Sequence, residues 1–120
     1  TRKTKTNNLL NLSGSATNST TGTSVVLAST VIGSTEDVLI YAIKIYGSTS
    51  YPVNFAVDNT AKAILNGSGD SIISTPDAPL FRVAAGSTFG ININTISTTA
   101  HTWNWTAIGK IEPTGAYLEP

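Results

Sequence analysis

The stretch HTWNWTAIGKIEP, residues 101–113, alternates large apolar and polar side chains. Its odd positions carry Trp103, Trp105 and Ile111, and its even positions are mainly polar, with Ile108 as the exception. Alternation with a period of two is typical of a β-strand that has one buried and one solvent-facing side. We therefore expect both indoles to point the same way and to form a wall of a protein core.

Similar short apolar runs recur along the whole chain, and clusters of Gly, Ser, Thr, Asn and Pro separate them. No segment shows the apolar spacing of an amphipathic helix. Runs of this length between such turn signals are typical of an all-β sandwich or barrel. We expect about eight strands in one β-sandwich, jelly-roll-like or immunoglobulin-like, built from the runs 23–32, 36–47, 52–58, 62–75, 78–86, 87–94 and 101–113.

Individual runs carry further signals. The near-continuous apolarity of 36–47 predicts a central strand. We expect one face to carry Leu39, Tyr41, Ile43 and Ile45, and the other to carry Ile40, Ala42 and Lys44. The run 62–75 predicts a hairpin whose turn is Asn66-Gly67-Ser68-Gly69, because these residues tolerate positive φ. Two prolines, Pro76 and Pro79, place the run that follows them at a sheet edge.

Composition limits the partners that the chain can have. Its 120 residues suit a single domain, and it contains neither Cys nor Met. Arg2, Lys3 and Lys5 lie in the first five positions; after them four bases face seven acids, a net charge of −3. We therefore expect no nucleic-acid surface on the folded body, and polyanion contact only through the N-terminus. No apolar run is long enough for a membrane span.

The residues for common catalytic and metal chemistry are missing. His101 is the only histidine, and one histidine without any cysteine cannot supply a zinc site. It is also the only histidine that could act as the base of a hydrolytic triad, but it lies beside two Trp residues on an alternating strand. We expect it to be a partly buried structural residue. Most acids fall at turns, and the loop acids Asp58, Asp70 and Asp77 lack the spacing of a calcium loop. We therefore predict a non-enzymatic protein without cofactor or metal.

Aromatic residues leave one ligand hypothesis open. Trp103, Trp105 and Tyr51 are the residue types that stack on a pyranose ring, so a carbohydrate-binding module is an alternative to a tryptophan core. Four N-x-S/T sequons are present, at Asn11, Asn18, Asn66 and Asn104. They can serve as glycosylation sites only if the protein is exported.

The two ends of the chain differ from its body. Residues 1–22 form a polar arm with a short apolar cluster, and residues 114–120 form a C-terminal tail around the domain 23–113. Such an arm can add a strand to a neighbouring molecule's sheet edge, although a disordered terminus is the alternative. The residues expected to act in assembly are Arg2, Lys3, Lys5, Leu9, Leu10 and Leu12.

The stretches EDVLIYAIKIYGSTSYPVNFAVD (36–58), APLFRVAAGSTFGINI (78–93) and TWNWTAIGKIE (102–112) together resemble small virion-surface proteins of tailed phages and archaeal viruses. These are capsid decoration or cement proteins and fibre-head domains. The resemblance implies a non-enzymatic subunit on the virion surface, whose partners are copies of itself or a major capsid protein. The Ser/Thr-rich arm with its sequons suits a second hypothesis equally well, an extracellular filament or pilus subunit linked by strand donation.

Overall fold

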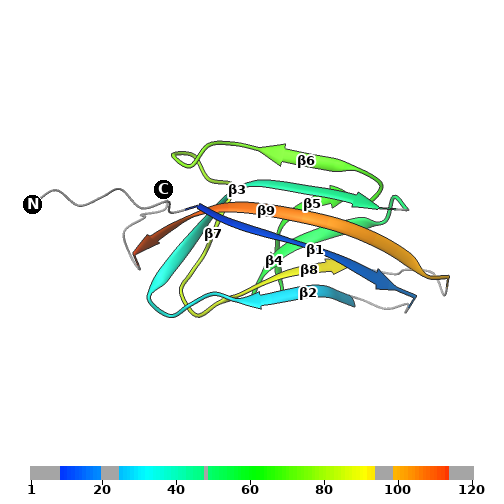
Figure 1. Ribbon diagram of the computed structural model, residues 1–120, viewed down its shortest axis with the longest axis horizontal. Coiled ribbons are helices and arrows are strands. Elements are labelled where there is room, and N and C mark those ends of the chain that lie inside the picture. The colour runs from blue at the N-terminus through cyan, green and yellow to red at the C-terminus, as the bar shows by residue number, and fades with distance from the viewer. Residues whose placement is uncertain (1–8, 20–24, 48, 94–98, 114–120) are drawn as a thin grey trace, which may run out of the picture.

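The computed structural model describes residues 9–19, 25–47, 49–93 and 99–113. Within these ranges every regular element is a β-strand, and none is a helix that could span a membrane. The described residues form nine strands (Figure 1): β1 (Leu9–Asn18), β2 (Val25–Val31), β3 (Glu36–Gly47), β4 (Pro52–Val57), β5 (Thr60–Asn66), β6 (Asp70–Ile73), β7 (Phe81–Val83), β8 (Thr88–Ile93) and β9 (His101–Pro113).

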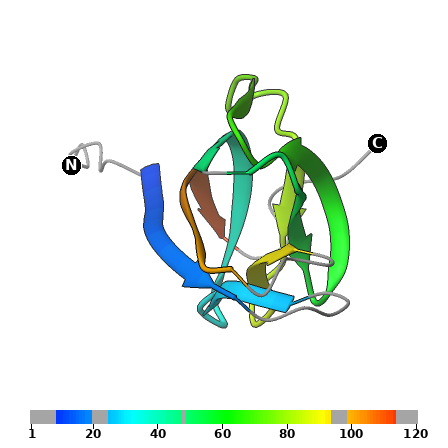
Figure 2. The same cartoon turned by 90° about the vertical axis from the view of Figure 1, so that its right-hand side faces the viewer.

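The strands form two antiparallel sheets in a β-sandwich-like arrangement. One sheet has the order β1-β9-β3-β6, with β7 also pairing with β3, and the other has the order β2-β8-β4-β5. The pairings are nested, since β4 pairs with β5, β3 with β6 and β7, β2 with β8, and β1 with β9. The view from the end shows these strands surrounding a shared interior (Figure 2).

Strand β9 confirms the alternation in the opening stretch. Trp103 is fully buried and Trp105 is 8% exposed, whereas Asn104 between them is exposed. Both indoles belong to one apolar cluster that also contains Phe55 and Phe89 from the opposite sheet. The tryptophans are therefore a wall of the core.

Strand β3 is central, as its apolarity predicts, but the expected assignment of its two faces is wrong. A bulge at Tyr41 lies between Ile40, which pairs with Gly109, and Ala42, which pairs with Ile108. The extra residue changes which positions of β3 point inward, because at the bulge two residues of β3 lie opposite one residue of β9. As a result Val38, Ile40, Ile43 and Ile45 join the core cluster, while Leu39 is buried outside it.

The run 62–75 does not form the expected hairpin. Its turn is present, since the Gly69 N–H donates to the carbonyl oxygen of Asn66 at 3.1 Å. However, β5 pairs with β4 in one sheet, and β6 pairs with β3 in the other. The turn therefore connects the two sheets, because β5 and β6 pair with β4 and β3 and not with each other.

The actual two-residue hairpin joins β4 to β5 at Asp58 and Asn59. Both residues have positive φ, 48° and 66°, as a type I′ turn requires. Asp58 also holds the turn against β8, since its Oδ1 accepts the Thr88 N–H at 2.9 Å. Strand β7 pairs only with β3, at the edge position that the two prolines predict.

The described part of the N-terminal arm lies in the chain's own sheet. Residues 9–18 form β1, whose partners on β9 run from Lys110 to His101, so the sandwich has nine strands instead of about eight. Leu10, Leu12 and Ala16 are half-buried on its inner side, and this alternation stabilises it as a strand. Arg2, Lys3 and Lys5, like residues 114–120, lie outside the described residues.

Candidate protein-binding edge and groove

Strand β1 presents an unprotected sheet edge. It pairs with β9 on one side, and none of the described strands pairs with its other side. Its sequence, LLNLSGSATN, is ten residues long and contains neither a charged residue nor a proline. Soluble proteins use charges, prolines, bulges or very short strands to prevent edge pairing. Strand β1 has none of these protections.

The other edge strands are all protected. Strand β2 is interrupted by a bulge between Val26 and Ala28. Strand β5 has an irregularity at its pairing with Phe55 and Ala56, and it carries Lys62 there. Strands β6 and β7 have only four and three residues. Among the described strands, β1 is therefore the edge best suited to accept a strand from another molecule.

Contacts with β9 hold the β1 edge in a fixed place. Gly14 lies opposite Trp105, and a Cβ atom built on Gly14 would be 2.9 Å from the indole carbon Cζ2. Further along, the hydroxyls of Thr17 and Thr102 are hydrogen-bonded at 2.7 Å. The edge is thus an ordered template whose outward side chains after Leu9, among them Ser13 and Ser15, are small and polar.

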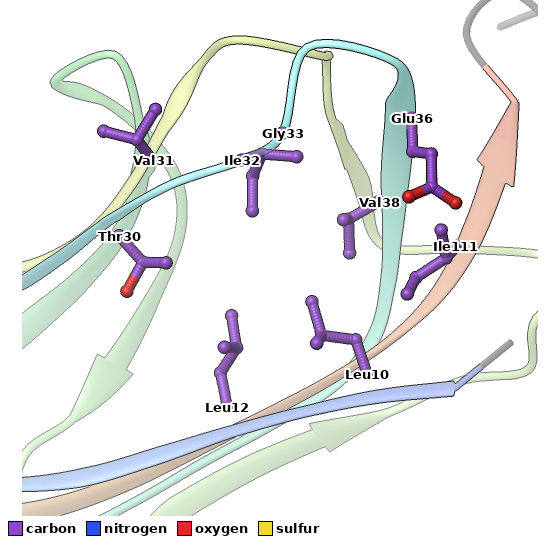
Figure 3. Close-up of a pocket in the computed structure, with 9 residues that line it drawn as sticks. All are labelled: Leu10, Leu12, Thr30, Val31, Ile32, Gly33, Glu36, Val38 and Ile111. Atoms are coloured by element: carbon purple, nitrogen blue, oxygen red, sulfur yellow. The ribbon is translucent and has the colours of Figure 1, made fainter.

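An apolar groove lies beside this edge. It has a volume of about 250 Å³ and separates β1 from the end of β2, where the two sheets diverge. Leu10 and Leu12 rise from β1 toward Ile32 and Val38 (Figure 3). Glu36 and Ile111 line one end of the groove. Its walls are therefore mostly aliphatic, with a carboxylate at one end.

The three candidate sugar-stacking aromatics differ in burial. Trp103 and Trp105 are buried, and neither indole Nε1 has a hydrogen-bond partner. Neither ring therefore has a free face for a pyranose. Tyr51 is half-buried, with its ring centroid 6.2 Å from that of His101 in an edge-to-face contact. His101 also packs at 6.0 Å from Trp103, which agrees with its expected structural role.

The loop acids serve local turns. Asp70 accepts the N–H groups of Asn66 and Ser71 at 3.1 and 2.9 Å, and Asp58 holds the β4–β5 turn. Asp77 is exposed between β6 and β7. Within the described residues, no three His, Asp or Glu side chains gather where a metal ion could bind. Asp58 and Asp70 therefore act as acceptors of backbone N–H groups.

Asp37 is a buried acid that the sequence pattern did not single out. It lies fully buried near the start of β3, where its Oδ1 accepts the Ala85 N–H at 2.8 Å. Its Oδ2 is 3.4 Å from the guanidinium of Arg82. These contacts attach the β7–β8 connection to β3, so the carboxylate is a structural element close to the groove.

An ion pair lies on β9 next to the beginning of β1. Lys110, which pairs with Leu9, has its Nζ 2.8 Å from Oε1 of Glu112. The hydrogen bond that Lys110 donates to the Glu112 carboxylate, together with the attraction of that carboxylate's charge, raises the pKa of Lys110 above the ordinary value. This charged pair sits one strand inward and leaves the β1 edge itself uncharged.

Sequence reasoning found part of this site. It named Leu9, Leu10 and Leu12 as an apolar cluster and assigned them to an extended N-terminal arm that acts in assembly. Leu9 is half exposed, while Leu10 and Leu12 line the groove. No family model, no curated protein and no solved structure matches this chain. We therefore infer a function from the geometry of the chain itself.

Proposed function

We propose that this protein is a non-enzymatic structural subunit that associates with copies of itself through the outer edge of β1. The single observation that carries the proposal is the contrast between β1 and the other edges. Strand β1 is long, uncharged and without proline, whereas each other edge strand is bulged, charged or very short. Added strands gain affinity from main-chain hydrogen bonds and register from side chains.

The nested strand order supports a place on a virion surface. When β6 and β7 are counted as one interrupted strand, the pairings are those of an eight-stranded hairpin rolled into two sheets, the jelly roll. Jelly rolls recur in viral capsid proteins, and this fold-level analogy agrees with the resemblance to capsid decoration proteins. We infer a capsid decoration or virion-surface subunit, with a major capsid protein as the further partner.

A second candidate function is a secreted filament or pilus subunit linked by strand donation. The observation that favours it is the apolar groove between β1 and β2, since a donated strand needs both a free edge and pockets for alternate side chains. A carbohydrate-binding module has weaker support, because Trp103 and Trp105 are in the core.

The test compares two single substitutions that place the same charge one strand apart. Ser15 and Asn104 are opposite each other, Ser15 on the β1 edge and Asn104 inside the sheet, and both are exposed. Light scattering over a range of concentrations should show the full chain and Asn104→Lys assembling, and Ser15→Lys remaining a monomer. Lysine on an edge strand opposes pairing. A full chain that is monomeric at every concentration would overturn the proposal.

Truncation offers a second comparison, provided that it leaves β1 in place. A chain lacking residues 1–8 keeps the whole strand, whereas one lacking residues 1–22 loses it and uncovers the edge of β9. We expect the shorter truncation to assemble as the full chain does. If assembly is lost with residues 1–8, then the basic segment containing Arg2, Lys3 and Lys5 is the linking element instead of β1.

A further inference from the structure

The apolar groove ends where the last strand ends. Ile111 of β9 lines the groove, and Pro113, two residues later, pairs with Glu36, which lines it as well. The chain continues for seven residues beyond Pro113, with the sequence TGAYLEP. Pro113, the last described residue, therefore stands at the end of the groove formed by Glu36 and Ile111.

The sequence after β9 contains a signal for chain reversal followed by apolar residues. Pro113, Thr114 and Gly115 are a turn combination, because proline presets φ at the second turn position and glycine suits the fourth or a position with positive φ. Ala116, Tyr117 and Leu118 follow directly. Five extended residues reach about 17 Å, so this apolar triplet is long enough to return along the groove.

The chemistry of the groove suits this triplet. Leu10, Leu12 and Val38 offer aliphatic surface to a leucine and to the face of a phenol ring. A buried tyrosine needs a partner for its hydroxyl, and the carboxylate of Glu36 stands at one end of the groove. The other terminal segment, residues 1–8, has the sequence TRKTKTNN and contains no apolar side chain.

We propose that the groove between β1 and β2 binds the chain's own residues 116–118, with Tyr117 and Leu118 covering Leu10 and Leu12. A tethered segment reaches the site at a high effective concentration, which favours it over the same segment of a second copy. This inference is independent of the proposed self-association. When the chain's own segment fills the groove, a second molecule can still pair with the outer edge of β1. It cannot donate a strand into the groove, because the groove is occupied.

The absence of cysteine from the chain allows a direct test by disulfide formation. The double variants Leu12→Cys/Tyr117→Cys and Leu12→Cys/Leu118→Cys each create the only two thiols in the protein. A disulfide requires Cα atoms about 4.4–6.8 Å apart, so its formation reports proximity. The matched controls replace Leu12→Cys by Ser13→Cys, because Ser13 is the next residue of β1 and is exposed on the outer side.

Mild oxidation is carried out at a concentration where light scattering shows monomers, and the products are identified by non-reducing electrophoresis and peptide mass. We expect an intramolecular disulfide from at least one Leu12→Cys variant, with a yield at least several-fold above its Ser13→Cys control. A disulfide-linked dimer would show that a second copy's segment fills the groove. Equal yields from positions 12 and 13, or no disulfide, would also overturn the inference.

A second measurement covers the case in which the double variants do not fold. Leu118→Asp should release the segment and open the groove, so that the dye ANS, which binds exposed apolar surface, gains at least twofold in fluorescence. The control Glu119→Gln changes a neighbouring residue and should leave ANS fluorescence unchanged. An unchanged signal from Leu118→Asp would contradict the inference. Neither readout depends on the Ser15→Lys comparison, so failure of one proposal is distinguishable from failure of the other.

Discussion

Gly47 of β3 lies directly opposite Trp103 of β9, and the indole occupies the space that a side chain at position 47 would need. A Cβ atom built on Gly47 would overlap the indole and would stand 2.7 Å from the carbonyl oxygen of Gly67. The same relationship joins Gly14 and Trp105 on the other side of β9. Each tryptophan thus packs over a glycine of a neighbouring strand.

We predict that Gly47→Ala destabilises the fold because the methyl group overpacks the space beside Trp103. Overpacking of this kind costs about 1–3 kcal/mol in the free energy of unfolding. The control is Gly33→Ala, since a Cβ atom there would meet nothing within 4 Å, and it should change stability by less than about 0.5 kcal/mol. Urea unfolding followed by tryptophan fluorescence measures both. Equal effects of the two substitutions would contradict the packing argument.

The burial of both indoles predicts a protected fluorescence. Acrylamide should quench the native emission several-fold less than it quenches the urea-unfolded chain, because Trp103 and Trp105 are enclosed in the core. The single variants Trp103→Phe and Trp105→Phe show which indole causes the quenching that remains in the native protein. Most of it should come from Trp105, the more exposed of the two. Quenching of the native protein to the unfolded level would refute the core position of the indoles.

The bulge at Tyr41 predicts that the length of β3 is critical. Deleting Tyr41 would force either Ile40 or Ile43 to the opposite face, since a shift of one residue exchanges the two faces of a strand. We expect this deletion to abolish cooperative thermal unfolding, as followed by circular dichroism. A glycine inserted after Ser34, in the exposed connection before β3, should keep the transition. A folded Tyr41 deletion would mean that the bulge is dispensable.

Asp37 should contribute through acceptance of a backbone hydrogen bond. Asp37→Ala leaves the part-buried Ala85 N–H without its acceptor, which should cost about 1 kcal/mol, the lower end of the penalty for a fully buried donor. Asp37→Asn keeps an oxygen at this position, so its loss of stability in urea unfolding should be the smaller of the two. Equal losses would assign the role of Asp37 to its charge instead of its hydrogen bond to Ala85.

The Lys110–Glu112 pair predicts a pH dependence in the alkaline range. Because Glu112 raises the pKa of Lys110 in the folded state, its contribution is complete below the pKa of the unfolded chain and disappears as pH rises through the folded pKa. NMR titration of Lys110 should show its pKa falling toward the ordinary value in Glu112→Gln. The stability difference between this variant and the parent should vanish at high pH. An unchanged pKa in the variant would exclude Glu112 as the cause.

Local patterns were sufficient to predict much of the fold. Alternation predicts β9 and β4, continuous apolarity predicts that β3 is central, and the prolines predict the edge position of β7. These features depend on residues within one strand, where each side chain's position follows from the period of two. The same reasoning assigned the residues of β1 to an N-terminal arm. Few positions of β1 are apolar, and the strand is stabilised mainly by its pairing with β9.

The sequence by itself determined the all-β class, the buried face of the opening stretch, and the absence of cysteine. Only the tertiary structure decided the bulge at Tyr41, the passage from β5 to β6 between sheets, and the closeness of Leu12 to Val38 in the groove. The period of a strand is a local property of the chain. The partner of a strand depends on which distant segments bury the most apolar surface and complete the most main-chain hydrogen bonds together.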